Sequence, residues 1–560
     1  MSEHTMNRSP KAFRRFAVPL ILSFVILILA GFWLYYFVIV SQHTPKADRV
    51  IAVLPFLNES GDPQDDYFVR SVTEHLTTQL SKISGIEAIS QRSLSANFVS
   101  TQNAAQIGKE LNANFVLLGS VNRSDDEGEF EARLLDVNDG KQLWTGKYDF
   151  DKNTLFEVES KLSIEIAEVL SIKLTDKERE FIMQKPTASN AAYDFYLKGR
   201  EYYYLYTNEG NEEAILMFKR ALSLDQSFAL AYAGLGDAYC KRTLEFGYSA
   251  KNLDSAIFVC NQALSLDPTV AETHKALGLI YYTKGWLRKC LEQWSRAIEI
   301  DPNYTDVINN FGVVLSQKGD LVEALEWIKK GIRLDPTQAR GYLTCGELYA
   351  DLIFDSAAMN WYNKAKKLDP NNLNYHVDVA LLNMYHEHYS DAFLESTNAL
   401  AIDSTNPLAL EVFGFVNLKQ KNYQKAEQCF QLNIVTDTMS EGVAALYYLH
   451  KKNGKIKDAL ELYLAAERYW KLQLQQGDEG FSIPYNLAVL YALNKNTEDA
   501  FLWLQRASDA GWLNYRWATT DPLLDGIRNE PRFIQMMNTI KETVDMQREA
   551  LAANSDIELP

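Results

Sequence analysis

The sequence predicts a mixed, mainly α-helical fold: a single N-terminal transmembrane helix, a small α/β domain and then an α-solenoid of helical hairpins. Three observations predict it. Residues 16–40 carry no charge, residues 50–175 alternate between strand-like and helix-like patterns, and an aspartate recurs every 34 residues from Asp267 to Asp437. A chain of 560 residues is long enough for several separate cores.

The predicted transmembrane helix is the uncharged run FAVPLILSFVILILAGFWLYYFVIV, residues 16–40. A helix of this length spans a hydrocarbon core of about 30 Å with some tilt. The alternative is a cleaved signal peptide, but the run is longer than the usual apolar stretch of about 7–15 residues and ends in bulky residues. Four basic residues precede the run and two follow it closely, so the positive-inside rule places residues 1–15 in the cytoplasm and the bulk of the chain outside it.

A small α/β domain is expected over residues 50–175. Its elements follow the order β-α-β-α-β-β-β-α, which is typical of an α/β sandwich. Two strand-like runs flank Asn138–Asp139–Gly140, a composition that favours a hairpin turn. We expect strands over 50–58, 87–92, 115–124, 130–137 and 141–150, and helices over 67–83, 104–111 and 155–174.

The recurring aspartates mark an internal repeat. Four of the six are followed by proline, which ends a helix because it cannot donate the i→i−4 hydrogen bond. A period of 34 residues with proline after the second helix is the tetratricopeptide (TPR) signature. We expect about eight hairpins over residues 190–510, coiled into a right-handed superhelix with a concave binding face, and a C-terminal capping segment and tail over 511–560.

Small and large residues recur at fixed positions within the repeats. Gly278 and Trp294 of one repeat correspond to Gly346 and Tyr362 of a later one. Small residues let two helices approach closely, and large ones fill the space between hairpins. The five cysteines lie in helical segments and form no CxxC pair, so we expect buried thiols at Cys240, Cys260, Cys290, Cys345 and Cys429.

Two stretches carry a family resemblance. IAVLPFLNESGDPQDDYF, IGKELNANFVLLGSVNRS and LLDVNDGKQLWTGKYD resemble the TolB amino-terminal-like domain, and AFLWLQRASDAGWLNYRWATTDPLLDGIRNEPRF resembles the TPR region found beside it. The chain thus resembles the non-catalytic part of bacterial adenylate-cyclase-like and CadC-like regulators. The resemblance implies an extracytoplasmic interaction or sensing module at the bacterial inner membrane. Relatives often carry a cyclase or winged-helix domain before the span; only about 15 residues precede it here, too few for a domain.

No pattern in the sequence predicts catalysis, a cofactor or a metal site, so we expect no enzyme. His386–Glu387–His388 is the most metal-like cluster, but it lacks the i,i+4 histidine spacing of HExxH and reads as a turn between two helices. Tyr202–Tyr203–Tyr204 could stack bases, although hairpin packing explains it better. The formal net charge of −17 repels phosphate backbones and argues against nucleic acid.

The expected partners are proteins or peptides that lie in the concave groove. First-helix positions expected to be exposed there could clamp a peptide backbone or a terminal carboxylate. The other reading is that they are only solvated surface positions. These residues are Lys275, Asn309, Gln317, Arg340, Glu347 and Asn374.

Two functions from different classes remain open. The first is a membrane-anchored, extracytoplasmic interaction scaffold or sensor that uses the TPR groove. The alternative is a regulatory subunit of a separately encoded signalling enzyme or transcriptional regulator, coupled to it through lateral contact within the bilayer.

Overall fold

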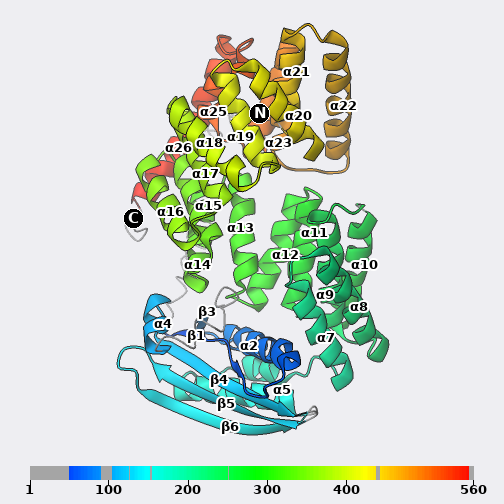
Figure 1. The fold of residues 1–560 in the computed structure, drawn as a ribbon, viewed down its shortest axis with the longest axis vertical. Coiled ribbons are helices and arrows are strands. Elements are labelled where there is room, and N and C mark those ends of the chain that lie inside the picture. Colours follow the sequence, from blue (N-terminus) through cyan, green and yellow to red (C-terminus); the bar gives the residue numbers. More distant parts are fainter. Residues whose placement is uncertain are drawn as a thin grey trace, which may run out of the picture.

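The computed structural model describes residues 49–89, 104–124, 127–151, 154–249, 251–436, 440 and 442–553. It shows a mixed sheet with helices on both faces, followed by a long run of paired helices (Figure 1). The predicted transmembrane helix at 16–40 lies outside the described residues. Within these ranges, every helix is too short or too polar to cross a bilayer.

The sheet has the strand order β3-β1-β4-β5-β6. β1 runs parallel to β3 and to β4, whereas β4, β5 and β6 form an antiparallel meander. Gly140, at a φ of 68°, lies in the predicted turn between β5 and β6. The strands are β1 (Val50–Val53), β2 (Leu57–Asn58), β3 (Glu87–Ile89), β4 (Phe115–Ser124), β5 (Glu127–Asp136) and β6 (Gln142–Asp151).

Helices cover both faces of the sheet because buried residues alternate along its strands. Ile51 and Val53 join the core under α2 (Asp66–Ser81) and α5 (Leu155–Val169), while Ala52 and Leu54 join a smaller core under α4 (Ala104–Glu110). The predicted β-α-β-α-β-β-β-α order is confirmed except that its first strand is divided into two, and a further helix, α6 (Asp176–Met183), follows it.

Two predicted elements of this domain have different limits in the structure. The single strand expected over 50–58 is wrong: it is divided into β1 and β2, with Pro55 between them. Proline has no amide hydrogen for the ladder, and the amide of Phe56 donates instead to Oγ1 of Thr73 at 3.2 Å. The helix expected over 155–174 ends at Val169, because Ser171 adopts a left-handed φ of 56°.

The array between residues 190 and 509 contains nine helix pairs in its described part, against the eight or so expected. The hairpins that end at Asp403 and Asp437 lack the following proline, which weakens their signature. In order, the pairs are α7 (Asn190–Tyr203) and α8 (Asn208–Leu224), α9 (Ala229–Leu244) and α10 (Lys251–Leu266), α11 (Ala271–Thr283) and α12 (Leu287–Ile300), α13 (Thr305–Gln317) and α14 (Leu321–Leu334), α15 (Ala339–Asp351) and α16 (Asp355–Leu368), α17 (Leu373–Tyr385) and α18 (Tyr389–Ile402), α19 (Pro407–Lys419) and α20 (Tyr423–Thr436), α21 (Gly442–Lys452) and α22 (Ile456–Gln475), and α23 (Ser482–Leu493) and α24 (Thr497–Asp509).

The recurring small residues are close contacts between the two helices of a pair. A Cβ added at Gly278 would overlap the indole of Trp294, and one at Gly346 would overlap the ring of Tyr362. The two glycines therefore determine how near the helices lie. All five cysteines are free and buried, which confirms the prediction of packed thiols; burial raises the pKa of Cys345 to about 12.

Each recurring aspartate from Asp267 to Asp403 begins the turn between two repeats, the inter-repeat turn. Asp301 and Asp403 are the C-cap residues of α12 and α18. One carboxylate oxygen accepts the amide hydrogen two residues on, at 3.1 Å from Asn303 and at 2.9 Å from Thr405. This closed Asx turn explains why an aspartate recurs even where proline does not.

The α/β domain lies against inter-repeat turns at the start of the array. α2 packs against α7, and its last residue, Ser81, donates its hydroxyl to both carboxylate oxygens of Asp301 at 3.0 and 3.1 Å. Nδ2 of Asn303 donates to the carbonyl oxygens of Ser81 at 3.0 Å and Ile86 at 2.7 Å. The turn 301–304 therefore connects the domain to the array, and it is called the docking turn below.

The chain after α24 folds back along the other edge of the array, where the turns within the hairpins lie. It contains α25 (Tyr515–Thr520), a short 3-10 helix (Pro522–Leu524) and α26 (Pro531–Ala553). Nη1 of Arg516 lies 2.9 Å from Oδ1 of Asp355, and Nε2 of Gln547 donates to the carbonyl oxygen of Gly319 at 2.8 Å. Residues 511–553 are called the C-terminal clasp.

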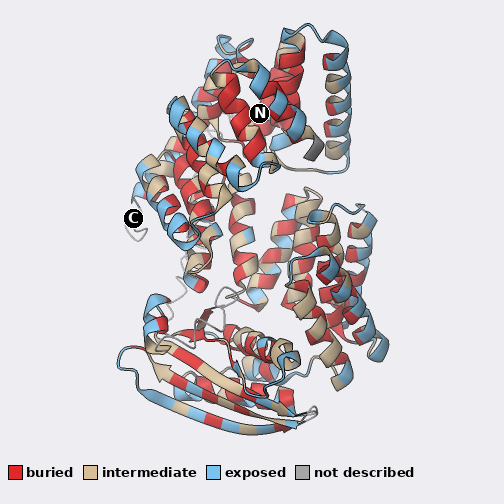
Figure 2. Ribbon diagram, in the orientation of Figure 1, coloured by how far each residue is buried: buried red, intermediate tan, exposed pale blue. Residues whose placement is uncertain are grey.

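A second long-range contact joins the eighth hairpin to the third. The indole nitrogen of Trp286, between α11 and α12, donates to the carbonyl oxygen of Gln476 at 2.9 Å. The amide of Glu479 donates to the carbonyl oxygen of Gly285, also at 2.9 Å. Figure 2 shows buried residues running through the interior of the helix pairs on both sides of this contact.

Candidate functional site

The first helices of many neighbouring pairs lie side by side, and the surface they share is called the inner face. α9 lies against α11, α15 against α17, and α17 against α19. The second helix of a pair instead packs between two first helices, as α14 does between α13 and α15. The predicted groove residues all belong to first helices, and the structure places them in three different settings.

Lys275 on α11 is held within the array. Its Nζ lies 2.7 Å from Oδ2 of Asp237 on α9, and the two side chains are only 12% and 2% exposed. Burial lowers the pKa of Lys275, but Asp237, Tyr204 and Asp306 together outweigh burial and the pKa is raised overall. Lys275 therefore joins two neighbouring first helices. The sequence reasoning missed Asp237, although the same repeat position carries an acid, Glu347, in α15; in α11 and α13 it carries Leu279 and Val313.

Asn309 and Gln317 on α13 also face other helices. The side-chain oxygen of Asn309 is buried against Gly331 on α14 and has no hydrogen-bond partner among the described residues. Nε2 of Gln317 donates to the hydroxyl of Tyr282 on α11 at 3.2 Å. Both side chains therefore contribute to contacts within the array.

Arg340 and Glu347 on α15 are open to solvent. Nη1 of Arg340 lies 3.9 Å from Oε1 of Glu347, and their side chains are 57% and 36% exposed. Beneath them lies Asp378 on α17, only 8% exposed. Burial, then Glu347, raise the pKa of Asp378, and Arg340 lowers it less. Asn374 is half-buried in the first turn of α17, where its amide donates to the side chain of Asn372.

The other sequence candidates have structural roles. Glu387, at a φ of 58°, forms the turn between α17 and α18, and Nε2 of His386 lies 3.0 Å from Oδ2 of Asp355. The predicted turn at His386–His388 is confirmed. The side chain of Tyr203 is buried, which confirms its packing role. Its carbonyl oxygen accepts a hydrogen bond from Nζ of Lys241 at 3.0 Å.

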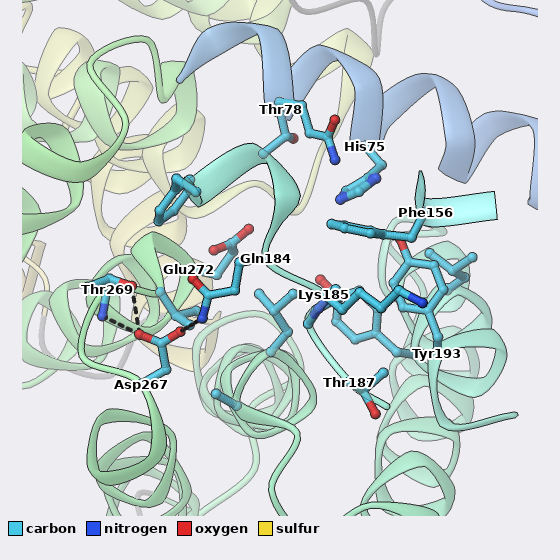
Figure 3. A pocket seen from close by; sticks show the side chains of 18 of the residues that line it. His75, Thr78, Phe156, Gln184, Lys185, Thr187, Tyr193, Asp267, Thr269 and Glu272 are labelled. Atoms are coloured by element: carbon cyan, nitrogen blue, oxygen red, sulfur yellow. Dashed lines mark hydrogen bonds between the residues drawn. The ribbon is translucent and has the colours of Figure 1, made fainter. Parts of the chain in front are cut away.

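A cavity of about 520 Å³ lies where the α/β domain meets the array, and the sequence reasoning missed it. Its walls come from α2, α5 and α6 on one side, and from α7 and the inter-repeat turns before α9 and α11 on the other. Figure 3 shows His75 beside Phe156 on one wall and Glu272 near Gln184 on another. This volume is called the junction cavity. Its lining residues are spread from Ser71 to Glu272, so no local pattern predicts it.

The polar groups of the junction cavity differ in how they are paired. Nδ1 of His75 lies 2.6 Å from Oε2 of Glu159, whose side chain is 1% exposed. Nη2 of Arg200 donates to Oε1 of Glu74 at 2.6 Å. Asp267 is the aspartate of an Asx turn and accepts the hydroxyl of Thr269 at 2.6 Å. A cavity with several convergent polar groups between two domains is a common setting for ligand binding.

Comparisons with known proteins agree with the helix pairs. Models of the tetratricopeptide repeat match residues 305–338, which cover α13 and α14, and residues 445–514, which cover most of α21 to α24.

One curated relative is the putative adenylate cyclase 3 of Rhizobium meliloti (strain 1021). It is 34% identical over 185 residues, which make up 33% of this chain and 32% of that protein. The chain thus spans about a third of the length of the curated relative it matches.

Similar solved structures include YrrB, a TPR protein with an unusual peptide-binding site, at 18% identity and a TM-score of 0.28, covering 34% of this chain and 95% of that one. PilF of Pseudomonas aeruginosa has 20% identity and a TM-score of 0.31 over 39% of this chain and 95% of its own. A thermophilic TPR protein of Thermus thermophilus has 20% identity and a TM-score of 0.29 over 35% of this chain and 100% of its own. From the repeat geometry and the two matched segments we conclude that the array of this chain is built of tetratricopeptide repeats.

Proposed function

We propose that this chain is a membrane-anchored, extracytoplasmic scaffold or sensor that binds a protein or peptide partner through the inner face of its TPR array. A repeat array of this kind is a protein-binding scaffold, because it offers one extended surface built from many similar helices. The uncharged run at 16–40 supports the anchor, and the basic residues before it support the orientation.

The observation that carries the proposal is the exposed pair Arg340 and Glu347 on α15. Their side chains are 57% and 36% exposed and the charged atoms are 3.9 Å apart, so the pair stabilises the fold by at most about 1 kcal/mol. The guanidinium of Arg340 remains available to donate hydrogen bonds to a carboxylate or a peptide carbonyl of a partner. Lys275 has no such freedom, because Asp237 holds it at 2.7 Å.

The direct test is site-specific crosslinking in intact cells. A photo-crosslinking residue at Arg340 should capture a discrete partner, whereas the same residue at Arg333, an exposed position on the second helix α14, should not. Arg340→Ala should weaken binding of the captured partner about tenfold with an unchanged melting temperature, the size expected for one charged hydrogen-bonded contact. Equal capture at both positions would argue against the inner face.

The predicted topology has its own test. The chain should stay with the membrane fraction after alkaline extraction, and residues 49–553 should be cleaved by protease added to spheroplasts. Release of the chain by alkali, or protection of these residues, would contradict the anchor or its orientation.

We also propose, as a second candidate, that the chain regulates a separately encoded signalling enzyme and catalyses no reaction itself. The similarity to a putative adenylate cyclase supports it, although the match covers only 32% of that protein. If so, a cyclase or a DNA-binding regulator should co-purify with the chain from detergent, and deleting the gene of this chain should change cyclic AMP levels or target transcription. If no cyclase or regulator co-purifies, and the deletion changes neither cyclic AMP levels nor target transcription, this second candidate is excluded.

A further inference from the structure

Three carboxylates gather on the inner face where α15 lies against α17. Glu347 and Asp351 are one helical turn apart on α15 and share a side of that helix with Arg340, because positions seven and eleven residues on return to the same side. Asp378 belongs to α17. Burial raises the pKa of Tyr362 on α16, and these three carboxylates raise it further. All three therefore lie around one buried side chain.

Asp378 differs from the other two because it is buried without a donor. Its side chain is 8% exposed, and its Oδ2 accepts no hydrogen bond within the described part of the chain. The charges that act on its pKa belong to Glu347, which raises it, and to Arg340, which lowers it less, so the carboxylate lies close to both. A buried carboxylate oxygen without a donor costs free energy. A cation with N–H groups would remove that cost.

Arg340 does not supply what these carboxylates lack. It is 57% exposed, and its Nη1 is 3.9 Å from Oε1 of Glu347. In the parts of the chain that the structure describes, no three acidic, histidine or cysteine side chains are placed to hold a metal ion. A wider cation with several donors suits such an arrangement, and a guanidinium can reach two carboxylates at once.

We propose that the inner face at α15 and α17 binds an arginine or lysine side chain of a protein partner, with its cationic group at the carboxylate of Asp378, beside Glu347. The inference rests on the proposed function and gives the chemistry of the partner. Either oxygen of Asp378 can accept the cation, because the carboxylate turns readily about its Cβ–Cγ bond. Arg340 would then be free to donate to a backbone carbonyl of the same partner.

The site is open enough to admit part of a macromolecule. Glu347 is 36% exposed and Asp351 is exposed at the last turn of α15. A long, flexible side chain can reach Asp378 from this surface while its backbone stays on the inner face. The bound cation would also favour the ionised form of Asp378, which burial and Glu347 disfavour in the free chain.

The first experiment uses end-blocked nonapeptides and the full chain purified in detergent. One library has a central arginine or lysine with uncharged residues elsewhere. In the second library the central residue is citrulline or acetyl-lysine, which keep the shape but lose the charge. Basic peptides should be retained, and the tightest should bind about tenfold more strongly than its neutral counterpart by calorimetry, because only the cation makes charge-assisted hydrogen bonds.

The second experiment locates the site with matched variants. Asp378→Asn should weaken the basic peptide about tenfold. Asp391→Asn removes the same charge from an exposed position on the second helix α18, and should leave the affinity unchanged. Glu347→Gln should weaken the peptide about threefold, because that carboxylate is more exposed. The melting temperature of free Asp378→Asn should not fall, since its Oδ2 has no donor to lose.

The result can separate this inference from the proposed function. A partner captured at Arg340 whose affinity is unaffected by Asp378→Asn would keep the inner face as a binding surface and overturn the basic side chain. Basic peptides that bind through Asp378, with no capture at Arg340 in cells, would support this site and count against the proposed function. Retention of no basic peptide, equal binding of the neutral counterpart, or affinity unchanged in both Asp378→Asn and Glu347→Gln would each overturn the inference.

Discussion

Asp301 and Asp403 occupy the same repeat position and close the same Asx turn, but their surroundings differ. The α/β domain covers Asp301, and burial raises its pKa to about 6. Asp403 lies in solvent, and hydrogen bonds from the amide and hydroxyl of Thr405 lower its pKa. The repeat therefore determines the shape of each turn, whereas the part of the molecule packed on it determines its electrostatics.

The comparison extends to the two edges of the array. At the inter-repeat turns the α/β domain is joined by buried polar contacts, such as those of Ser81 and Asn303. Along the hairpin turns the C-terminal clasp also buries apolar side chains, among them Phe533 and Leu551, each 2% exposed. The stability of the first edge should therefore depend on pH and on single hydrogen bonds. The stability of the second edge should depend on buried apolar volume.

The largest effect on the free energy of unfolding is expected at the C-terminal clasp. Phe533→Ala should lower the free energy of unfolding by about 3–5 kcal/mol, since it removes a buried aromatic side chain and leaves a cavity. Met546→Ala, on the same helix but 63% exposed, should change it by at most about 0.5 kcal/mol. Urea unfolding of both variants provides the measurement. Equal losses would mean that α26 does not hold the array through its buried side.

The next effect depends on pH. The pKa of Asp301 is raised from 3.8 to about 6 in the folded state, so its contribution to stability is full below pH 3.8 and is lost as pH rises through about 6. The loss is about 3 kcal/mol, and Asp301→Asn should abolish it while keeping the Asx acceptor. Asp403 has a lowered pKa, so its contribution is present at neutral pH and is lost in acid.

Urea unfolding of Asp301→Asn and Asp403→Asn from about pH 2 to pH 8 measures the difference in free energy of unfolding between each variant and the parent chain, because the contribution of Asp403 is lost only at acid pH. The two difference curves should slope in opposite directions. Curves of the same sign would show that the α/β domain does not cover Asp301 in solution.

A smaller effect is expected from one side chain of the docking turn. Asn303→Ala should weaken docking by about 1–3 kcal/mol, because the carbonyls of Ser81 and Ile86 lose their donor. Asn371→Ala is the control, since Asn371 holds the same position after an aspartate at an exposed turn. Faster proteolysis between residues 170 and 190 in Asn303→Ala alone is the expected result. Matching rates in both variants would contradict the docking contact.

The smallest effect is expected where the eighth hairpin meets the third. Trp286→Phe removes the hydrogen bond to Gln476 and should cost about 0.5–1.5 kcal/mol. Hydrogen exchange of the Glu479 amide, which donates to Gly285, should quicken in the same variant. An unchanged exchange rate would mean that the contact is open in solution.

Local patterns in the sequence predicted the local structure well. The aspartate period, the small residues at Gly278 and Gly346, and the turn at Gly140 each depend on residues within one repeat or one hairpin. The contacts of Asn303 with Ile86 and of Gln547 with Gly319 join residues more than 200 positions apart, and no periodicity encodes them. The inner-face residues could be assigned to helices because that assignment depends only on the local repeat pattern. The contact between Lys275 and Asp237 could not be predicted, because it joins two different hairpins.

The clasp and the contact at Trp286 together change how the array can deform. Stacks of helix pairs usually stretch and recoil like a spring, because each repeat touches only its neighbours. Here Trp286 reaches the eighth hairpin, and Gln547 ties the end of the chain to the turn of the fourth. A pulling force applied to the last hairpins would first act on these two contacts, before neighbouring repeats separate. The array should therefore extend less under force than an array without such long-range contacts.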